Sequence, residues 1–68
     1  MTLQISTFEC EREDLIGHGH VIVRGDGVLT HFNFAPEFGI SKSEAERQAK
    51  LFVAAMEFVD QRIVEAAQ

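Results

Sequence analysis

Three histidines, His18, His20 and His31, are the side chains of this chain best suited to chemistry. His18 and His20 stand two residues apart, so in an extended strand they share one face. His31 falls on the facing strand of the hairpin expected here, as a diagonal neighbour of His20. Three imidazoles on one surface can bind zinc, and a site with three protein ligands could be catalytic. A metal-binding protein or small metal-dependent enzyme is therefore one hypothesis, although His-x-His on a strand is a weak motif.

Cys10, the single cysteine, is the other side chain with reactive chemistry. No internal disulfide can form, and no helix N-terminus follows Cys10 to activate its thiol. Gly17-His18-Gly19 lacks the Lys-Ser/Thr of a phosphate-binding loop. No nucleophile elbow and no paired carboxylates at recognisable spacing occur. We therefore expect a structural thiol, no catalytic residues and no cofactor.

The chain is acidic, with 11 Asp and Glu against 6 Lys and Arg and a formal net charge of −5. No basic stripe is present that could neutralise phosphates, so direct binding to nucleic acid is not expected. Four carboxylates gather in one run, which consists of Glu9, Glu11, Glu13 and Asp14. This run could dock on a basic protein surface or mimic phosphates, or it could be a solvated face.

A β-hairpin is the clearest element that the sequence predicts. Asp26-Gly27 suits a type I′ turn, in which both central residues have positive φ. A two-residue turn there places Arg24 opposite Leu29 and His20 opposite Asn33. The apolar side chains that then share one face are Val21, Val23, Phe32 and Phe34. The opposite face carries His20, Ile22, Arg24, Leu29 and His31, a mixture that resembles a recognition surface as much as a solvated one.

The N-terminal residues predict a further strand, with Leu3 and Ile5 on one face. Phe8 and Cys10 continue the alternation out of phase with them. This change of phase favours a bulge or bend near Thr7.

The last third of the chain predicts one long helix over residues 42–67. Ser41 and Glu44 form an expected capping box at its start. One apolar stripe follows steps of four and three residues, and its main members are Ala45, Ala49, Phe52, Met56, Val59 and Ile63. A second stripe on one flank consists of Leu51, Ala55, Phe58 and Arg62.

The apolar arc of this helix is wider than the ordinary value of about 100°. A three-stranded sheet can cover the central stripe but hardly both flanks. Either loop residues such as Phe38 and Ile40 fold over the flanks, or the flank pairs with another chain. We expect a homodimer whose interface contains Leu51, Ala55, Phe58 and Arg62.

A chain of 68 residues is near the lower limit for a domain without disulfides or metal. We expect a single domain over residues 1–68 of the α+β class. Its three-stranded antiparallel meander has strands at about 2–10, 18–24 and 28–35 and packs against the helix. The predicted core consists of Leu3, Ile5, Val21, Val23, Phe32, Phe34, Phe52, Met56, Val59 and Ile63.

These features favour a small, acidic, non-enzymatic protein-binding module that acts as an inhibitor or adaptor. The residues expected to contact its partner protein are Glu9, Glu11, Glu13, Asp14, His20, Ile22, Arg24, Leu29 and His31. In length, charge and strand-plus-helix pattern the chain is similar in general form to phage-encoded inhibitors of host defence, such as anti-CRISPR or anti-restriction proteins. The N-terminal residues lack the pattern of a signal peptide, and no stretch is long and apolar enough to span a bilayer, so we expect a cytoplasmic protein.

Overall fold

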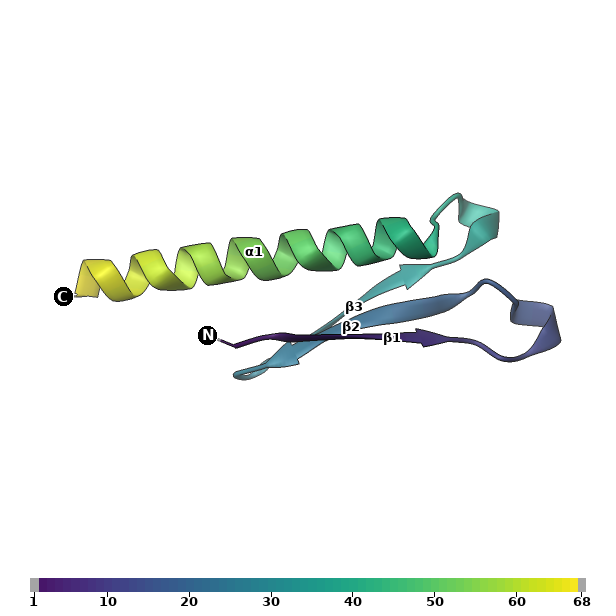
Figure 1. Cartoon of the computed structure of the whole chain (residues 1–68), viewed down its shortest axis with the longest axis horizontal. Coiled ribbons are helices and arrows are strands. Elements are labelled where there is room, and N and C mark those ends of the chain that lie inside the picture. The colour runs from purple at the N-terminus through teal and green to yellow at the C-terminus, as the bar shows by residue number, and fades with distance from the viewer. Residues whose placement is uncertain (1, 68) are drawn as a thin grey trace.

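A computed structural model, which describes residues 2–67, shows three antiparallel strands followed by one long helix (Figure 1). The strands are β1 (Gln4–Glu9), β2 (Gly19–Gly25) and β3 (Val28–Phe34), and they lie in the order β1-β2-β3. The helix α1 (Lys42–Ala67) crosses one face of the sheet, mainly over β2 and β3. The predicted βββα arrangement of the α+β class is confirmed.

The β2–β3 hairpin has the predicted turn and register. Asp26 and Gly27 have positive φ angles of 48° and 83°. Arg24 pairs with Leu29, and His20 pairs with Asn33. The carboxylate of Asp26 also accepts a hydrogen bond of 2.8 Å from the backbone N–H of Thr2, which ties the start of the chain to the hairpin tip.

Strand β1 is regular, so the predicted bulge near Thr7 is absent. Pairing with β2 runs without interruption from Gln4, opposite Arg24, to Glu9, opposite Gly19. Ile5 therefore lies on the side of the helix, and Phe8 lies on the other side of the sheet. The backbone of β1 stays regular, and Ile5 and Phe8 therefore lie on opposite faces of the sheet.

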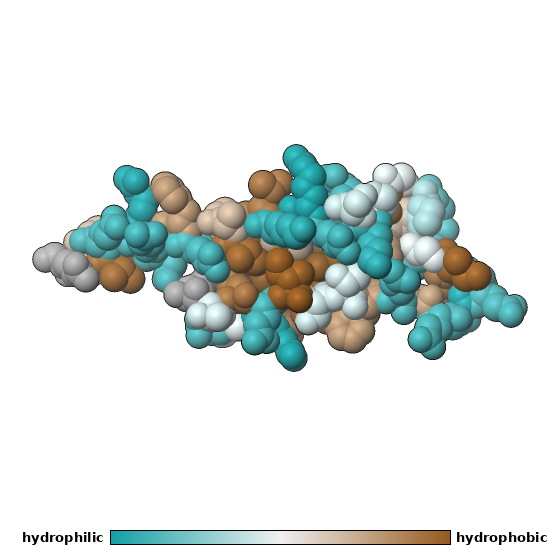
Figure 2. All heavy atoms as spheres, in the orientation of Figure 1, coloured by the Kyte–Doolittle hydropathy of each residue, from teal (hydrophilic) through white to brown (hydrophobic). Residues whose placement is uncertain are grey.

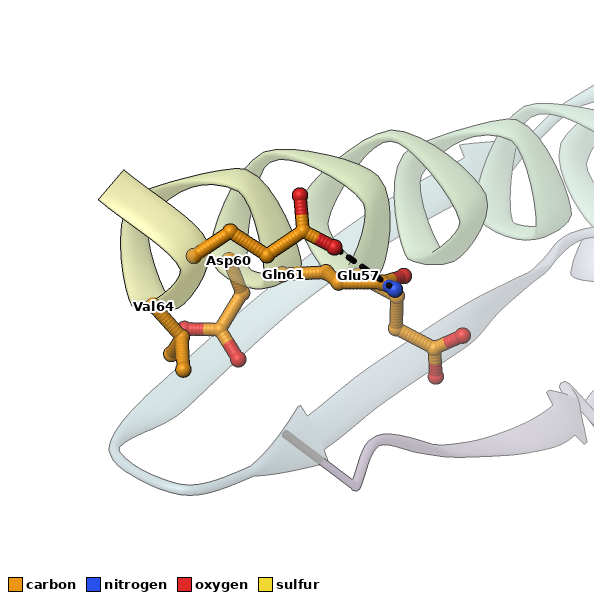
Figure 3. A pocket seen from close by; sticks show the side chains of 5 residues that line it. Glu57, Asp60, Gln61 and Val64 are labelled. Atoms are coloured by element: carbon orange, nitrogen blue, oxygen red, sulfur yellow. Dashed lines mark hydrogen bonds between the residues drawn. The ribbon is translucent and has the colours of Figure 1, made fainter. Parts of the chain in front are cut away.

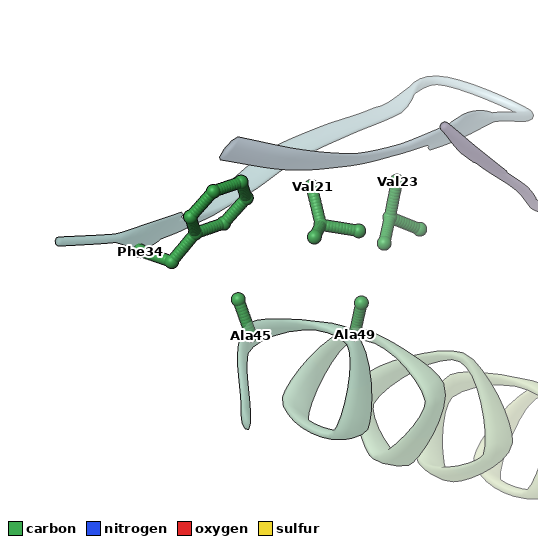
Figure 4. Close-up of a cluster of buried hydrophobic side chains, with 5 residues drawn as sticks. All are labelled: Val21, Val23, Phe34, Ala45 and Ala49. Atoms are coloured by element: carbon green, nitrogen blue, oxygen red, sulfur yellow. The ribbon is translucent and has the colours of Figure 1, made fainter. Parts of the chain in front are cut away.

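The core is small and lies under the first turns of α1. Among the described residues, the buried apolar side chains are Val21, Val23, Phe34, Ala45 and Ala49 (Figure 4). The partly buried apolar side chains packed against them are Leu3, Phe32, Ile40, Phe52 and Val53. Phe52 meets Phe32 edge to face, with ring centroids 5.7 Å apart.

Ile5, Val59 and Ile63 were predicted in the core, and the structure exposes all three. Val59 is 52% exposed and Ile63 is 62% exposed. The 26 residues of α1 extend about 39 Å, whereas each seven-residue strand extends only about 23 Å. The helix outruns the sheet, so the last part of its apolar stripe has no strand beneath it. Ile5 is exposed because α1 hardly covers β1.

The molecule is consequently elongated. Its principal dimensions are 53 × 20 × 12 Å, and its radius of gyration is 14.6 Å. A compact chain of the same length would have a radius of gyration of about 11 Å. The fold therefore leaves much of its apolar surface outside a common core.

The start of α1 is capped by one half of the predicted capping box. The side-chain oxygen of Ser41 accepts a hydrogen bond of 3.1 Å from the backbone N–H of Glu44. The carboxylate of Glu44 turns instead toward its own helix, where it accepts hydrogen bonds from Arg47 at 3.1 Å and Gln48 at 3.3 Å.

Gly19 allows β1 and the Phe34 ring to approach β2 closely, and its replacement tests this packing. A Cβ atom at Gly19 would stand 2.1 Å from the carbonyl oxygen of Phe8 and 2.4 Å from Cζ of Phe34. We expect Gly19→Ala to lower the free energy of unfolding by about 2–3 kcal/mol, measured by chemical denaturation.

Gly39→Ala is the matched control for this substitution. Gly39 has a φ of +74° and open space around its Cα, so alanine there meets backbone strain alone, at a cost of about 1–2 kcal/mol. A Gly19→Ala variant no less stable than Gly39→Ala would contradict the close packing of Phe34 over β2.

Candidate protein-binding surfaces

The face of the sheet turned away from α1 carries the predicted recognition residues. The structure places on it, as one group, Phe8, His20, Ile22, Arg24, Leu29 and His31, and we call this group the outer sheet face. Leu29 is 70% exposed, and Phe8 is exposed as well. Phe8 was missed because a bulge was assumed in β1, whereas simple alternation from Gln4 would have placed it here.

Three rings form a row across the strands on the outer sheet face. The ring centroids of Phe8 and His20 are 5.6 Å apart, and those of His20 and His31 are 5.2 Å apart. The two imidazoles are nearly parallel, with an angle of 17° between their planes. The row presents ring surfaces that can pack against apolar groups and nitrogen atoms that can form hydrogen bonds.

A small hollow lies beside this row of rings. Its volume is about 80 Å³, and it is lined by Ser6, Phe8, Ile22 and Arg24. Sites for small molecules usually measure about 300–1,000 Å³. The hollow can therefore accept one side chain of a partner, with Arg24 among the residues around it, but not a typical substrate.

His18 does not join the other two histidines. Its Nε2 atom lies 3.2 Å from Oε2 of Glu37, which belongs to the short 3-10 turn Pro36–Phe38 after β3. Within residues 2–67, no group of three or more His, Cys, Asp or Glu side chains is placed to hold a metal ion. The three-histidine arrangement of the metal hypothesis is therefore not assembled.

The acidic run does not form one continuous surface. Glu9 projects from the helix side of β1, and its carboxylate binds the ammonium group of Lys42 at the start of α1. The hydrogen bond that Lys42 donates to Glu9, and then the negative charge of Glu9, raise the pKa of Lys42 above the ordinary 10.5. Asp14 pairs with Arg12 at 3.0 Å. The other two carboxylates of the run, Glu11 and Glu13, are exposed. Neither takes part in an ion pair that the structure shows within residues 2–67.

The predicted dimer residues form a stripe on the far side of α1. At about 100° per residue, Leu51 stands about 200° around the helix from the buried Ala49. Leu51 is 55% exposed and Phe58 is 60% exposed. The guanidinium carbon of Arg62 lies 5.4 Å from the centre of the Phe58 ring. The sheet of the same chain cannot reach this stripe.

The loop before α1 does not cover the stripe either. Phe38 is largely exposed, whereas Ile40 packs against the core. Of the two loop residues expected to cover the helix flanks, Phe38 does not do so, and Ile40 contributes to the core. Figure 2 shows apolar side chains at the surface along the whole length of the molecule, in brown between polar ones.

A larger hollow of about 500 Å³ lies beside the C-terminal half of α1 (Figure 3). Its lining residues all come from this one helix, and they are Glu57, Asp60, Gln61, Val64 and Glu65. The side-chain amide of Gln61 donates a hydrogen bond of 3.3 Å to Glu65. The hollow contains no nucleophile and no imidazole, and it is an open space beside the helix rather than an enclosed substrate site.

Comparison with protein family models, curated proteins and solved structures finds no match to this chain. Within the part of the chain that the structure describes, no helix is both long enough and apolar enough to cross a membrane.

The placement of the histidines makes a prediction for zinc binding. Two stacked imidazoles without a third ligand should bind Zn²⁺ no tighter than roughly micromolar in calorimetry. Asn33 lies opposite His20 and two residues after His31, so Asn33→His adds a third imidazole to the pair. We expect this variant to bind Zn²⁺ at least about tenfold more tightly. Submicromolar binding by the natural chain that His18→Ala removes would contradict the observed geometry.

Proposed function

We propose that this chain is a small, non-enzymatic protein-binding module that acts as an inhibitor or adaptor, and that the outer sheet face contacts the partner protein. One observation carries the proposal: the solvent side of a regular sheet holds the exposed side chains of Phe8 and Leu29 beside His20, His31 and Arg24. A solvated sheet face is usually polar, because antiparallel sheets alternate apolar residues inside with polar residues outside.

The composition of the outer sheet face fits a protein partner better than other ligands. Aromatic residues and arginine are enriched at protein interfaces, and isolated carboxylates are depleted there. The outer sheet face contains no carboxylate, although the chain as a whole has a net charge of −5. The hollow beside Arg24 matches one inserted side chain in size. The net negative charge continues to argue against nucleic acid.

An inhibitor needs only to cover a surface of its target, and a domain of this size can do so. Standard interfaces bury about 800 Å² on each partner, a fraction of the 5092 Å² of accessible surface of this chain. The same proposal places the protein in the cytoplasm and names a phage or another mobile element as its source. Both points rest on the likeness in size and charge to inhibitors of host defence.

The proposal is tested by affinity capture from the native host with matched baits. We expect one host protein to be recovered in stoichiometric amount by the natural chain and by Gln61→Glu, and to be lost with Leu29→Glu. Both substitutions add one negative charge at an exposed position, one on α1 and one on the outer sheet face. Each should change the free energy of unfolding by less than about 0.5–1 kcal/mol, so all three baits are folded.

Recovery that is the same with the Leu29→Glu bait would show that the outer sheet face is not the binding surface. An empty capture from folded natural bait, repeated at low salt, would count against the inhibitor or adaptor function as a whole.

A further inference from the structure

The exposed apolar side of α1 is continuous. At about 100° per residue, five side chains occupy one arc of the helix that begins where the sheet contact ends. They are Leu51, Ala55, Phe58, Val59 and Arg62, and we call them the outer helix face. Arg62 adds its aliphatic stem to this face and holds its guanidinium over the Phe58 ring.

The second half of α1 contributes no fully buried residue to the core of its own chain. Ala49 is the last buried residue of the helix, yet the helix continues to Ala67. Isolated helices of this length are marginal in water, and most helices in proteins are stabilised by packing of an apolar face. Contacts made to the outer helix face would supply this packing to the second half of α1.

Two charged residues beside the outer helix face indicate what can cover it. Arg47 lies near the start of α1 and Glu65 lies near its end, on the same side of the helix. Two parallel copies would bring Arg47 to Arg47 and Glu65 to Glu65. Two antiparallel copies bring Arg47 of each helix beside Glu65 of the other. At these two positions the helix is therefore complementary in charge to itself when one copy is reversed.

The sizes of the side chains on the outer helix face indicate how two antiparallel helices would be aligned. Phe58 is the largest residue of the outer helix face, and Ala55 is the smallest. When Phe58 of each copy lies over Ala55 of the other, Leu51 meets the aliphatic stem of Arg62, and Arg47 comes beside Glu65. Because a twofold axis relates the copies, each of these contacts occurs twice.

We propose that a second copy of this chain covers the outer helix face, with the two α1 helices antiparallel and Phe58 of each copy packed over Ala55 of the other. The two sheets then lie on the outside of the dimer. Both outer sheet faces remain accessible, so the dimer presents two copies of the surface proposed to bind the partner protein. The dimer does not depend on that proposed function, because it uses different residues.

Sedimentation equilibrium tests the dimer and the surface that forms it. Interference optics are suitable because the chain contains no Trp and no Tyr. We expect a dimeric mass for the natural chain and an increase of about 100-fold in the dissociation constant for Phe58→Glu. Leu29→Glu adds the same charge on the outer sheet face, which the proposed dimer leaves accessible, and should change the constant by less than about threefold. Circular dichroism verifies that each variant keeps its sheet.

Disulfide formation between variants tests the antiparallel register. In a Cys10→Ser background, chains with Leu51→Cys and chains with Arg62→Cys are prepared separately and mixed, with one chain tagged to distinguish its mass. The proposed register predicts a mixed disulfide between the two chains on mild oxidation. Each variant alone should form at least about fivefold less disulfide, because its two cysteines lie about 16 Å apart along the helix axis.

Three results would overturn the proposal. A monomeric mass at millimolar concentration would exclude the dimer. A dimer that Phe58→Glu leaves intact would place the contact elsewhere. Disulfides that form between identical positions, in preference to the mixed pair, would show parallel helices.

Discussion

The close approach of α1 to the sheet through two alanines is the contact on which the rest of the structure depends. Ala45 and Ala49 bring the helix backbone down onto Val21 and Val23, and Phe34 closes the end of this layer (Figure 4). Small residues on the helix permit this approach, and a larger side chain at either alanine would lift α1 from the strands. The contact fixes which sheet face is covered and which is left to solvent.

Because this contact involves only the first turns of α1, the rest of the helix projects past the sheet. A chain of 68 residues has little apolar surface to bury, and here part of it stays outside the core. Two separate surfaces result. The outer helix face is apolar and self-complementary, which suits a second copy of the chain. The outer sheet face combines aromatic rings, aliphatic side chains and one arginine, which suits a different protein.

Local signals in the sequence predicted the elements whose cause is local. Asp26-Gly27 determines the turn and hence the hairpin register, and Ser41 marks the helix start. Features set by distant contacts were not predictable in this way. The apolar spacing of α1 could not reveal that Ile63 lies beyond the end of the sheet. Likewise, the spacing of His18 and His20 could not show that His18 contacts Glu37, from a distant turn, and not the other two imidazoles. Phe8 was misplaced because an irregular strand was assumed where a regular one fits.

In the proposed dimer, another copy of the same chain stabilises the second half of α1. This can be measured by amide hydrogen exchange, followed by mass spectrometry at two protein concentrations. We expect the amides of residues 55–67 to be protected in concentrated solution and to lose this protection on dilution below the dissociation constant of the dimer, while β2 and β3 stay protected. Equal protection of these helix amides at both concentrations would contradict this expectation, because the helix would then be stable on a single chain.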